Sequence, residues 1–327
     1  MSISDKNKKF SKLAALFVLL LFAIWFLSSK DMIATESHIF EVKKGSSMGS
    51  IAQELSNKGF IKSELFFTSF SKFLNANKKL KSGYYEILPG TSVWTFIDKI
   101  STGSVLSTKV TLIEGKTIKF YFNQLTNDPS IKPSGSLKEV MTSIGINEPY
   151  DGWFFPETYS FNYGESLENV LKRAHQELMK NLMVLWDQRD KGLPLKSPYE
   201  AIILASLIEN ETALDEEKSL ISGVFIRRLN EGMRLQTDPT VIYALGDAYS
   251  PPLKKSDLRI NSLYNTYRNK GLPPGAISSV GYQSLFAALH PSSNTDLYFV
   301  SKKDGSHAFA PNYEKHKENI KKYLNNN

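Results

Sequence analysis

The sequence predicts an α+β protein whose chain carries a single transmembrane helix close to its N-terminus. Two observations support this prediction. An uncharged apolar run follows a cluster of lysines at the start of the chain, and short strand, turn and helix patterns alternate over residues 38–125. The chain has 327 residues, of which 41% are hydrophobic and 22% charged, which is enough for about two folded domains. We divide it into residues 1–12, 13–29, 38–125 and 126–327.

Composition excludes several classes of chemistry. The chain contains no cysteine, so it has no disulfides, thiolate metal sites or cysteine nucleophile. Its net charge of +7, from 40 basic and 33 acidic residues, at first suggests an anionic partner. However, residues 1–12 hold +3 of it (four lysines against one aspartate), and residues 311–327 hold +2 (four lysines against two glutamates). The region between is nearly neutral, so we expect no nucleic-acid partner.

Residues 13–29 have the composition of a membrane anchor. No charge occurs between positions 13 and 27, and a helix over residues 11–29 would be about 28 Å long, near the hydrocarbon thickness of a bilayer. A cleaved signal peptide and a buried soluble helix are the alternatives, but no small-x-small cleavage site follows the apolar run. We therefore predict a cytoplasmic tail at residues 1–12, a single-pass anchor in the cytoplasmic (inner) membrane, and an extracytoplasmic location for the rest.

Residues 38–125 contain three similar segments, which begin at positions 40, 85 and 110. Each one reads as a short strand, a glycine turn, a Ser or Thr that caps a helix, and apolar residues at i and i+4. The first segment ends at Gly59, a typical helix C-terminus. Such a strand–helix unit resembles the LysM module, which binds cell-wall glycans. A small α+β packing domain that binds nothing explains the same pattern equally well.

An aromatic segment and a long helix follow. Residues 150–161 include six aromatic side chains together with glycine and proline, and they follow neither helical nor strand periodicity. Aromatic faces in a loop suit stacking on sugars, although a buried aromatic cluster is the commoner fate of such residues. Residues 167–190 then predict a helix with one apolar stripe and an otherwise solvated, charged surface.

The strongest chemical signal is a buried helix that starts near Tyr199 and ends in two glutamates, Glu209 and Glu211. Glu209 shares its helix face with small residues that would leave room for a ligand, whereas Glu211 points roughly to the opposite side. A carboxyl group against apolar neighbours has a raised pKa, which a general acid needs near neutral pH. Both glutamates could also simply mark where the helix leaves the core, and geometry gives Glu209 only a modest preference.

The segments that follow are typical of a carbohydrate site. Residues 233–240 and 264–267 combine neutral polar side chains with aromatic rings, which can hydrogen-bond sugar hydroxyl and acetamido groups and stack on sugar faces. No GxGxxG or Walker pattern indicates phosphate binding, and no G-x-S-x-G elbow indicates a serine hydrolase. The five histidines lack the HxxxH spacing of zinc hydrolases. We expect no metal and no other cofactor.

Five motifs in this order resemble the YceG-like (MltG) endolytic murein transglycosylases. They are FPETY (155–159), IENET (208–212), MRLQTDPT (233–240), YNTY (264–267) and GLPPG (271–275). The resemblance implies a membrane anchor, a LysM-like α+β subdomain at residues 38–125 and a mixed α+β catalytic domain at residues 126–327. Two positions depart from the family pattern: Arg227 replaces a common Asn, and Val280 replaces the proline before a glycine.

The resemblance also assigns roles to residues. The family's catalytic glutamate is the first one of its Ile-Glu-x-Glu motif, which is Glu209 here. The resemblance further implies cleavage of the β-1,4 bond between N-acetylmuramic acid and N-acetylglucosamine within glycan strands, with 1,6-anhydro ends as products. We expect the following residues to bind the glycan: Glu157, Tyr159, Gln236, Asp238, Thr240, Tyr264, Asn265 and Tyr267.

Two other functions stay open at this point. One is a non-catalytic, membrane-tethered protein that binds peptidoglycan and recruits cell-wall synthases. The other is a muramidase that hydrolyses the same bond, although hydrolysis normally requires two carboxyl groups. The expected partners are peptidoglycan strands, the cytoplasmic membrane and cell-wall synthases, and the family's role in ending strand elongation enters through the resemblance alone.

Overall fold

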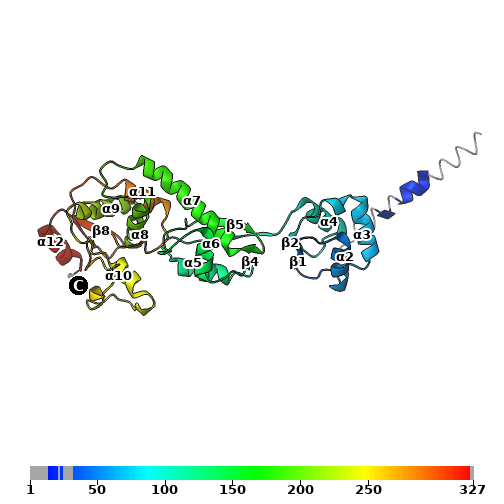
Figure 1. The fold of residues 1–327 in the computed structure, drawn as a ribbon, viewed down its shortest axis with the longest axis horizontal. Helices are drawn as coiled ribbons and strands as arrows, with labels where there is room; N and C mark the ends of the chain where they lie inside the picture. The colour runs from blue at the N-terminus through cyan, green and yellow to red at the C-terminus, as the bar shows by residue number, and fades with distance from the viewer. Residues whose placement is uncertain (1–13, 21–22, 25–31, 325–327) are drawn as a thin grey trace, which may run out of the picture. The chain divides into compact units, whose positions relative to one another are not determined.

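A computed structural model describes residues 14–20, 23–24 and 32–324 of the chain (Figure 1). The fold is a mixed α+β fold, as predicted. The chain forms two compact units. Unit 1 comprises the chain up to Thr108 together with Ser160–Gly164, and unit 2 comprises Lys109–Tyr159 and everything from Glu165 onward.

The predicted membrane anchor falls partly outside the described residues. Residues 14–20 are helical, but in the part of the chain that the structure describes no helix is both long and apolar enough to cross a bilayer. The predicted cytoplasmic tail, residues 1–12, and several positions of the anchor at residues 13–29 are not described. The anchor therefore stays a prediction.

Unit 1 is a two-stranded antiparallel sheet packed with three helices. The strands are β1 (His38–Val42) and β2 (Gly83–Ile87), and His38 lies opposite Ile87. The helices are α2 (Met48–Asn57), α3 (Glu64–Phe73) and α4 (Val93–Thr102), and a 3₁₀ turn, η1 (Ala76–Lys78), precedes β2. Alternate side chains of the strands and one face of each helix are buried in a single core. Its largest fully buried side chains include Phe40, Tyr85 and Phe96.

Capped helices occupy the three positions where the repeated pattern predicts them. Ser47, Ser92 and Thr117 each take an extended backbone, and each side chain accepts a hydrogen bond from the N–H three residues later. This bond satisfies one of the N–H groups that the first turn of a helix leaves unpaired. The third segment, β3 (Ser107–Thr111) followed by α5 (Ile118–Thr126), contributes its helix to unit 2 and not to unit 1.

Unit 2 is built mainly from helices. After α5 the chain forms the short strands β4 (Ile131–Lys132), β5 (Thr158–Asn162) and β6 (Glu165–Ser166). Strand β5 starts in unit 2 and ends in the part of unit 1 at Ser160–Gly164. It pairs with β3, and β6 runs parallel to β4. The further helices and 3₁₀ turns are α6 (Leu137–Ile144), α7 (Leu167–Gln188), α8 (Pro198–Glu211), α9 (Asp215–Asn230), α10 (Asp238–Leu245), η2 (Gly246–Ala248), η3 (Asp257–Arg259) and α11 (Tyr282–Leu289).

Helix α8 is the centre of the unit 2 core. Ser197 caps it and Pro198 starts it, and every residue from Ala201 to Ile208 is buried. A helix that is apolar on all sides must be enclosed by other elements. Helices α7, α9, α10 and α11 pack around it, and Figure 1 shows α9 and α11 beside it. The predicted buried helix is confirmed, and so is the long helix predicted at residues 167–190, which is α7.

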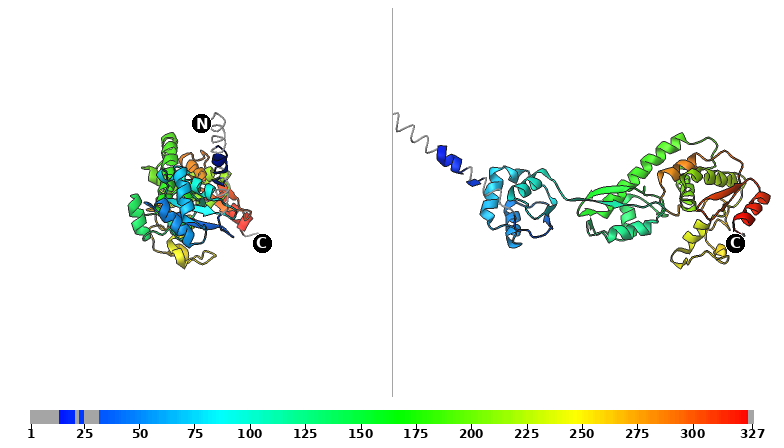
Figure 2. Two further views of the ribbon diagram at one scale, coloured as in Figure 1. Left: turned by 90° about the vertical axis from the view of Figure 1, so that its right-hand side faces the viewer. Right: turned by 180° about the vertical axis from the view of Figure 1, so that it is seen from behind.

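The C-terminal part of unit 2 is a hairpin and a helix. Strands β7 (Tyr298–Ser301) and β8 (His307–Ala310) pair in antiparallel fashion, and α12 (Tyr313–Leu324) packs against both, as the red end of the chain in Figure 2 shows. Arg228 of α9 joins this hairpin to the core, because its guanidinium donates to the carbonyl oxygens of Leu297 and Leu235.

The aromatic segment is mostly buried. Phe154, Phe155, Tyr159 and Phe161 are each less than one-tenth exposed. Trp153 is partly buried and stacks on Tyr199, with 4.6 Å between the ring centroids. Most of these rings therefore serve the core, which is the commoner fate expected for them.

Candidate active site

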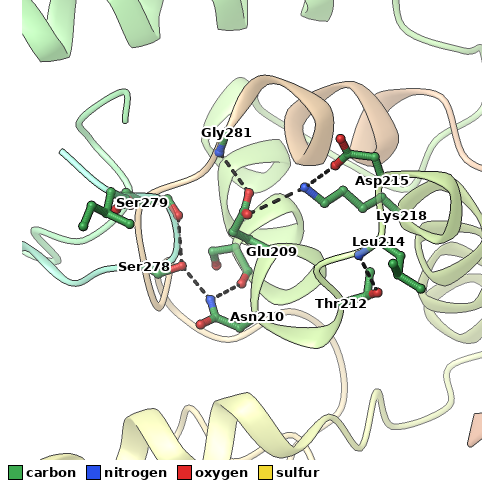
Figure 3. A network of polar contacts seen from close by, with 11 residues as sticks. Glu209, Asn210, Thr212, Leu214, Asp215, Lys218, Ser278, Ser279 and Gly281 are labelled. Carbon is green, nitrogen blue, oxygen red and sulfur yellow. Dashed lines mark hydrogen bonds and ion pairs between the residues drawn. The ribbon is translucent and has the colours of Figure 1, made fainter. Parts of the chain in front are cut away.

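Glu209 lies in the last turn of α8, where the helix emerges from the core (Figure 3). Its side chain is only 7% exposed. The N–H of Gly281, the residue that precedes α11, donates to Oε2 of Glu209 at 2.9 Å. Oε1 lies 3.7 Å from the Nζ of Lys218. One carboxyl group is thus held from both sides by an amide and an ammonium group.

Lys218 is a buried cation that serves two carboxylates. It lies on α9 with a side chain that is 6% exposed, and its Nζ is 2.9 Å from Oδ1 of Asp215 as well as 3.7 Å from Glu209. A buried charge is costly unless it is paired, so this contact keeps the ammonium group fixed. Figure 3 shows Asp215, Lys218 and Glu209 in a continuous chain of contacts.

The loop that carries Gly281 is fastened to α8 by hydroxyl groups. Oγ of Ser206 accepts the N–H of Ile277, and Nδ2 of Asn210 donates to Oγ of Ser278 at 2.6 Å. Because these bonds start from two successive turns of one helix, they fix the path of the loop. The Gly281 amide is therefore presented to Glu209 in one position.

A second backbone segment, residues 113–117, lies against the same loop. The N–H of Gly115 donates to the carbonyl of Ser279, and the N–H of Ser279 donates to the carbonyl of Lys116. The two segments exchange hydrogen bonds like neighbouring strands. This exchange brings the end of β3 and its following turn close to Glu209.

These backbone hydrogen bonds also place a second carboxyl group, that of Glu114, near the site. A methyl group on Gly281 would overlap the Glu114 carboxyl, so this carboxyl lies directly against the Gly281 backbone. Desolvation first, and then the negative charge of Glu209, raise the pKa of Glu114, while Lys218 lowers it. Glu114, which is exposed, and Glu209 therefore both lie against the backbone of Gly281.

A pocket of about 540 Å³ is lined by residues next to Glu209. Its wall includes Gly115 and Asn210, and a methyl group on Gly115 would be 4.0 Å from Cγ of Glu209. A volume of this size is within the range of ligand pockets. The remaining lining residues come from α5, α10, η2 and two loops: Thr117, Lys119, Asp151, Pro239, Ile242, Tyr243, Gly246, Asp247 and Ile277.

Asp151 and Tyr243 line both this pocket and a more open one, which Tyr264 also lines. Oδ1 of Asp151 accepts the N–H of Ile118, and Oδ2 accepts the hydroxyl of Tyr243 at 2.7 Å. Burial raises the pKa of Asp151, and these two bonds lower it. The Tyr243 and Tyr264 rings are 4.8 Å apart, and both contact the second pocket. Aromatic faces beside hydrogen-bonding groups suit a sugar ligand.

Glu211 belongs to a different network from Glu209. Thr237 donates its hydroxyl to the Glu211 carboxyl. Burial raises the pKa of Glu211 to about 7, the charge of Asp238 acts in the same direction, and His307 and Arg228 oppose it. The raised pKa that the sequence suggested for a glutamate against apolar neighbours is therefore seen at Glu211. Glu209 instead has charged and polar partners.

Several predicted binding residues have their polar atoms occupied within the protein. Thr240 and Asn265 are fully buried, and Asn265 donates to the carbonyls of Leu258 and Ile260. Thr240 bonds the Thr237 carbonyl and the Thr266 hydroxyl. These groups shape the loops around α10.

The other predicted binding residues are more varied in position. Tyr159 is buried and donates its hydroxyl to the Phe155 carbonyl. Tyr267 donates to the carboxylate of Asp238, and Gln236 is exposed with a left-handed backbone, φ 52°. Tyr264 contacts the second pocket. Their roles in glycan binding stay predictions.

Glu157 is exposed and lies on the Glu114 side of the site, where its charge raises the pKa of Glu114. Its backbone carbonyl accepts the N–H of Leu112, which ties it to the end of β3. Its role in glycan binding stays a prediction as well.

Sequence reasoning did not select Glu114, Lys218, Asp151 or Tyr243. Glu114 was assigned only to a glycine turn, and Lys218 is one of many charged residues on its helix. The one sequence feature that could have pointed to Glu114 is its position in a Glu-Gly pair directly after a strand. Among the residues that the structure describes, no group of three or more His, Asp or Glu side chains is arranged to hold a metal ion.

The sequence pattern of the YceG-like family matches residues 40–322. The chain belongs to the YceG-like family. The matched range contains the whole candidate site, including Glu114 and Glu209. Membership of the family, expected from five motifs, is thus confirmed.

Relatives and a solved structure agree with this assignment. A protein of Bacillus subtilis (strain 168) named endolytic murein transglycosylase is 31% identical over 309 residues, which are 86% of this chain and 84% of that protein. A protein of the same name from Streptococcus pneumoniae (strain R6) is 28% identical, and the match spans 87% of this chain but only 58% of the relative. The crystal structure of a putative YceG-like protein from Listeria monocytogenes aligns with a TM-score of 0.56 at 28% identity, covering 87% of this chain and 99% of that one.

Proposed function

We propose that this chain is an endolytic murein transglycosylase that cleaves the MurNAc-β-1,4-GlcNAc bond within peptidoglycan strands. The observation that carries the proposal is the placement of Glu209, a nearly buried carboxyl group that is oriented by the Gly281 amide and Lys218 and directly precedes Asn210, a residue that lines a pocket. Two relatives bear the name of this activity. The family pattern extends over the site.

The reaction needs one carboxyl group that acts twice. Protonated Glu209 gives its proton to the glycosidic oxygen, and the C1–O bond breaks to leave an oxocarbenium-like centre on the muramic residue. The carboxylate then takes the proton of the muramic C6 hydroxyl, whose oxygen bonds to C1 and closes a 1,6-anhydro ring. Glu209 ends protonated, as it began, with the proton of the C6 hydroxyl in place of the one it gave to the leaving sugar, and no water is consumed.

The partners of Glu209 suit this sequence of steps. The Gly281 N–H and the Lys218 ammonium group stabilise the carboxylate that exists after the first proton transfer. They also fix the side chain, so the same group is in position for the return of the proton. Along the pocket, Asn210 offers its amide group for hydrogen bonding, and Tyr243, oriented by Asp151, offers a ring face.

A hydrolytic muramidase is the second candidate, because the site contains a second carboxyl group. Glu114 lies near Glu209, and hydrolysis with two carboxyl groups would use one as the acid and the other as the base or nucleophile. The products distinguish the two reactions. Transglycosylation leaves anhydro ends, whereas hydrolysis leaves reducing ends that are heavier by one water molecule.

The N-terminal part completes the proposal. The lysines before the apolar run favour a cytoplasmic N-terminus and an anchor at residues 13–29, which would hold the catalytic unit outside the cytoplasm near nascent strands and cell-wall synthases. The strand–helix–helix–strand order of unit 1 supports a LysM-like role in glycan binding. Fusing a reporter that is active only outside the cytoplasm to the C-terminus tests the topology. An inactive fusion would contradict it.

The activity is tested by incubating the purified protein with peptidoglycan and measuring the masses of the products. We expect internal cleavage with anhydro ends. Glu209→Gln should abolish cleavage while leaving folding and glycan binding intact, and Glu318→Gln, on the exposed face of α12, is the matched control that should cleave normally. Binding without cleavage by the unmodified protein would indicate the scaffold function instead.

A further inference from the structure

Unit 1 exposes three large apolar side chains on the neighbouring helices α3 and α4 (Figure 1). Leu65 is 78% exposed, Phe73 is 64% exposed and Trp94 is 48% exposed. Leu65 and Phe73 are eight positions apart on α3, which places them about 80° apart around the helix axis. Trp94 is the second residue of α4. We call these three side chains the apolar face of unit 1.

The members of this face are joined through a ring of the core. Phe70 is 5% exposed, and its ring centroid lies 6.5 Å from that of Phe73 and 5.8 Å from that of Trp94. Single apolar side chains on a surface are ordinary, but a contiguous group of them marks a site of interaction. The apolar face is such a group, because one buried ring contacts two of its members.

The chain enters unit 1 beside this face. The N–H of Met32 donates to the carbonyl of Thr91, and the N–H of Ile33 donates to the carbonyl of Phe60. Thr91 lies shortly before the start of α4, and Phe60 lies shortly before the start of α3. These two bonds therefore fix the incoming chain next to the beginnings of the two helices that carry the apolar face.

The predicted anchor ends close to this point in the sequence. It covers residues 13–29, and Met32, which is buried in the core of unit 1, follows three positions later. Even a fully extended chain spans only about 11 Å over three residues. One headgroup layer of a bilayer is about 5–7 Å deep. An anchored protein therefore holds unit 1 against the membrane surface, with the beginnings of α3 and α4 close to the anchor.

We propose that the apolar face of unit 1 inserts into the extracytoplasmic surface of the membrane and so orients unit 1 on the bilayer. The inference goes beyond the proposed activity and rests on the proposed anchor at residues 13–29. Tryptophan is the residue type most typical of the interface between water and lipid, which suits Trp94. Leucine and phenylalanine side chains such as Leu65 and Phe73 enter the boundary between headgroups and acyl chains.

The charged side chains around this face are balanced in number. Lys62 and Lys72 are exposed beside it, and so are Glu64 and Asp98. Attraction to anionic lipids therefore adds little, and burial of apolar surface provides the binding. The two lysines can extend their ammonium groups to the headgroups while their apolar stems stay near the inserted side chains. Vesicles of uncharged phosphatidylcholine are thus a sufficient probe.

The test uses the absence of cysteine, since a single introduced thiol then carries a single dye. Full-length protein with Leu65→Cys, Phe73→Cys or the control Lys44→Cys is labelled with a polarity-sensitive dye and reconstituted into phosphatidylcholine vesicles. Lys44 is exposed in the turn after β1, beyond the end of that strand opposite to His38, whose ring contacts the Phe60 ring. Near-ultraviolet circular dichroism checks that each labelled protein is folded.

We expect the dyes at positions 65 and 73 to emit at shorter wavelength than the dye at position 44. Bromine atoms on the lipid acyl chains should quench most of the emission at positions 65 and 73 and leave the emission at position 44 unchanged. Adding Trp94→Ser to the protein labelled at position 65 should weaken the quenching, because the face then buries less apolar surface.

Several results would overturn the inference. One is a protein that floats with the vesicles but whose dyes at positions 65 and 73 behave like the dye at position 44. Emission at shorter wavelength without quenching by bromine would assign the face to a protein partner or a second copy of the chain. A change that appears only when peptidoglycan strands are added would assign it to glycan. A protein that does not float with the vesicles would contradict the anchor and this inference together, whereas the proposed activity is measured separately by cleavage of peptidoglycan.

Discussion

Replacing Glu211 by glutamine should make the protein's stability less dependent on pH. In the folded protein, burial raises the pKa of Glu211 to about 7 from an ordinary value of 4.5. A carboxyl group whose pKa rises on folding binds more protons in the folded state than in the unfolded state. Stability therefore falls as the pH rises from about 4.5 to about 7 and then levels off. Glutamine has the same shape and does not ionise.

The size of this change in stability follows from the pKa shift of Glu211. Each unit of pKa corresponds to about 1.4 kcal/mol, so the shift of Glu211 costs about 3 kcal/mol of folding free energy above pH 7 relative to pH 4. The difference in unfolding free energy between Glu211→Gln and the unmodified protein should change by this amount, in favour of the variant at high pH. Urea denaturation at pH 4.5, 6 and 8, near and between the two pKa values, measures the difference.

A second variant independently checks the direction in which Glu211 makes stability change with pH. The Thr237 hydroxyl donates to Glu211 and lowers its pKa, so Thr237→Val should raise that pKa further and make stability fall more steeply with pH. A difference between Glu211→Gln and the unmodified protein that is the same at all three pH values would refute the reasoning. It would mean that Glu211 is ionised in the folded protein at neutral pH.

Three further predictions concern the pocket and its surroundings. Gly152→Ala should lower the free energy of unfolding by several kcal/mol, seen as a lower denaturation midpoint, because Gly152 has φ 86° and its new methyl would lie 2.5 Å from the Ala276 methyl. Gly281→Ala should leave the unfolding midpoint almost unchanged, since φ is −76°, yet reduce the rate of glycan cleavage, because the new methyl would overlap the Glu114 carboxyl and disturb the amide that donates to Glu209; an unchanged rate would contradict this role of the Gly281 amide. Lys119→Met should not change the unfolding midpoint, since its ion pair with Asp247 is solvent-exposed, and a large loss would contradict that.

The fold could be predicted best where the chemistry is local. Ser47, Ser92 and Thr117 cap helices because a hydroxyl after a glycine turn satisfies the first free N–H groups wherever the segment packs. The same local signal does not state which core a helix joins, so α5 was grouped with the two segments before it although it packs in unit 2. The apolar run of α8 predicted its burial because no polar face was available to meet solvent.

The site was less predictable, because residue type does not reveal the direction of a side chain. Asn265 and Thr240 have the polarity of sugar-binding residues, yet both are buried and bonded to the protein itself. Glu209 and Glu211 are two positions apart, and only the family resemblance separated them. Glu114 lies near Glu209 because of backbone hydrogen bonding between Gly115 and Ser279, which are more than 160 positions apart, and no periodicity in the sequence encodes that pairing.

The most direct test of the central claim is the mass of the ends that the protein creates when it cuts peptidoglycan. The account predicts internal cleavage that leaves 1,6-anhydro-muramic ends, lighter by one water molecule than hydrolytic ends, and no cleavage by Glu209→Gln. Reducing ends, or anhydro ends still formed by a folded Glu209→Gln protein, would contradict it.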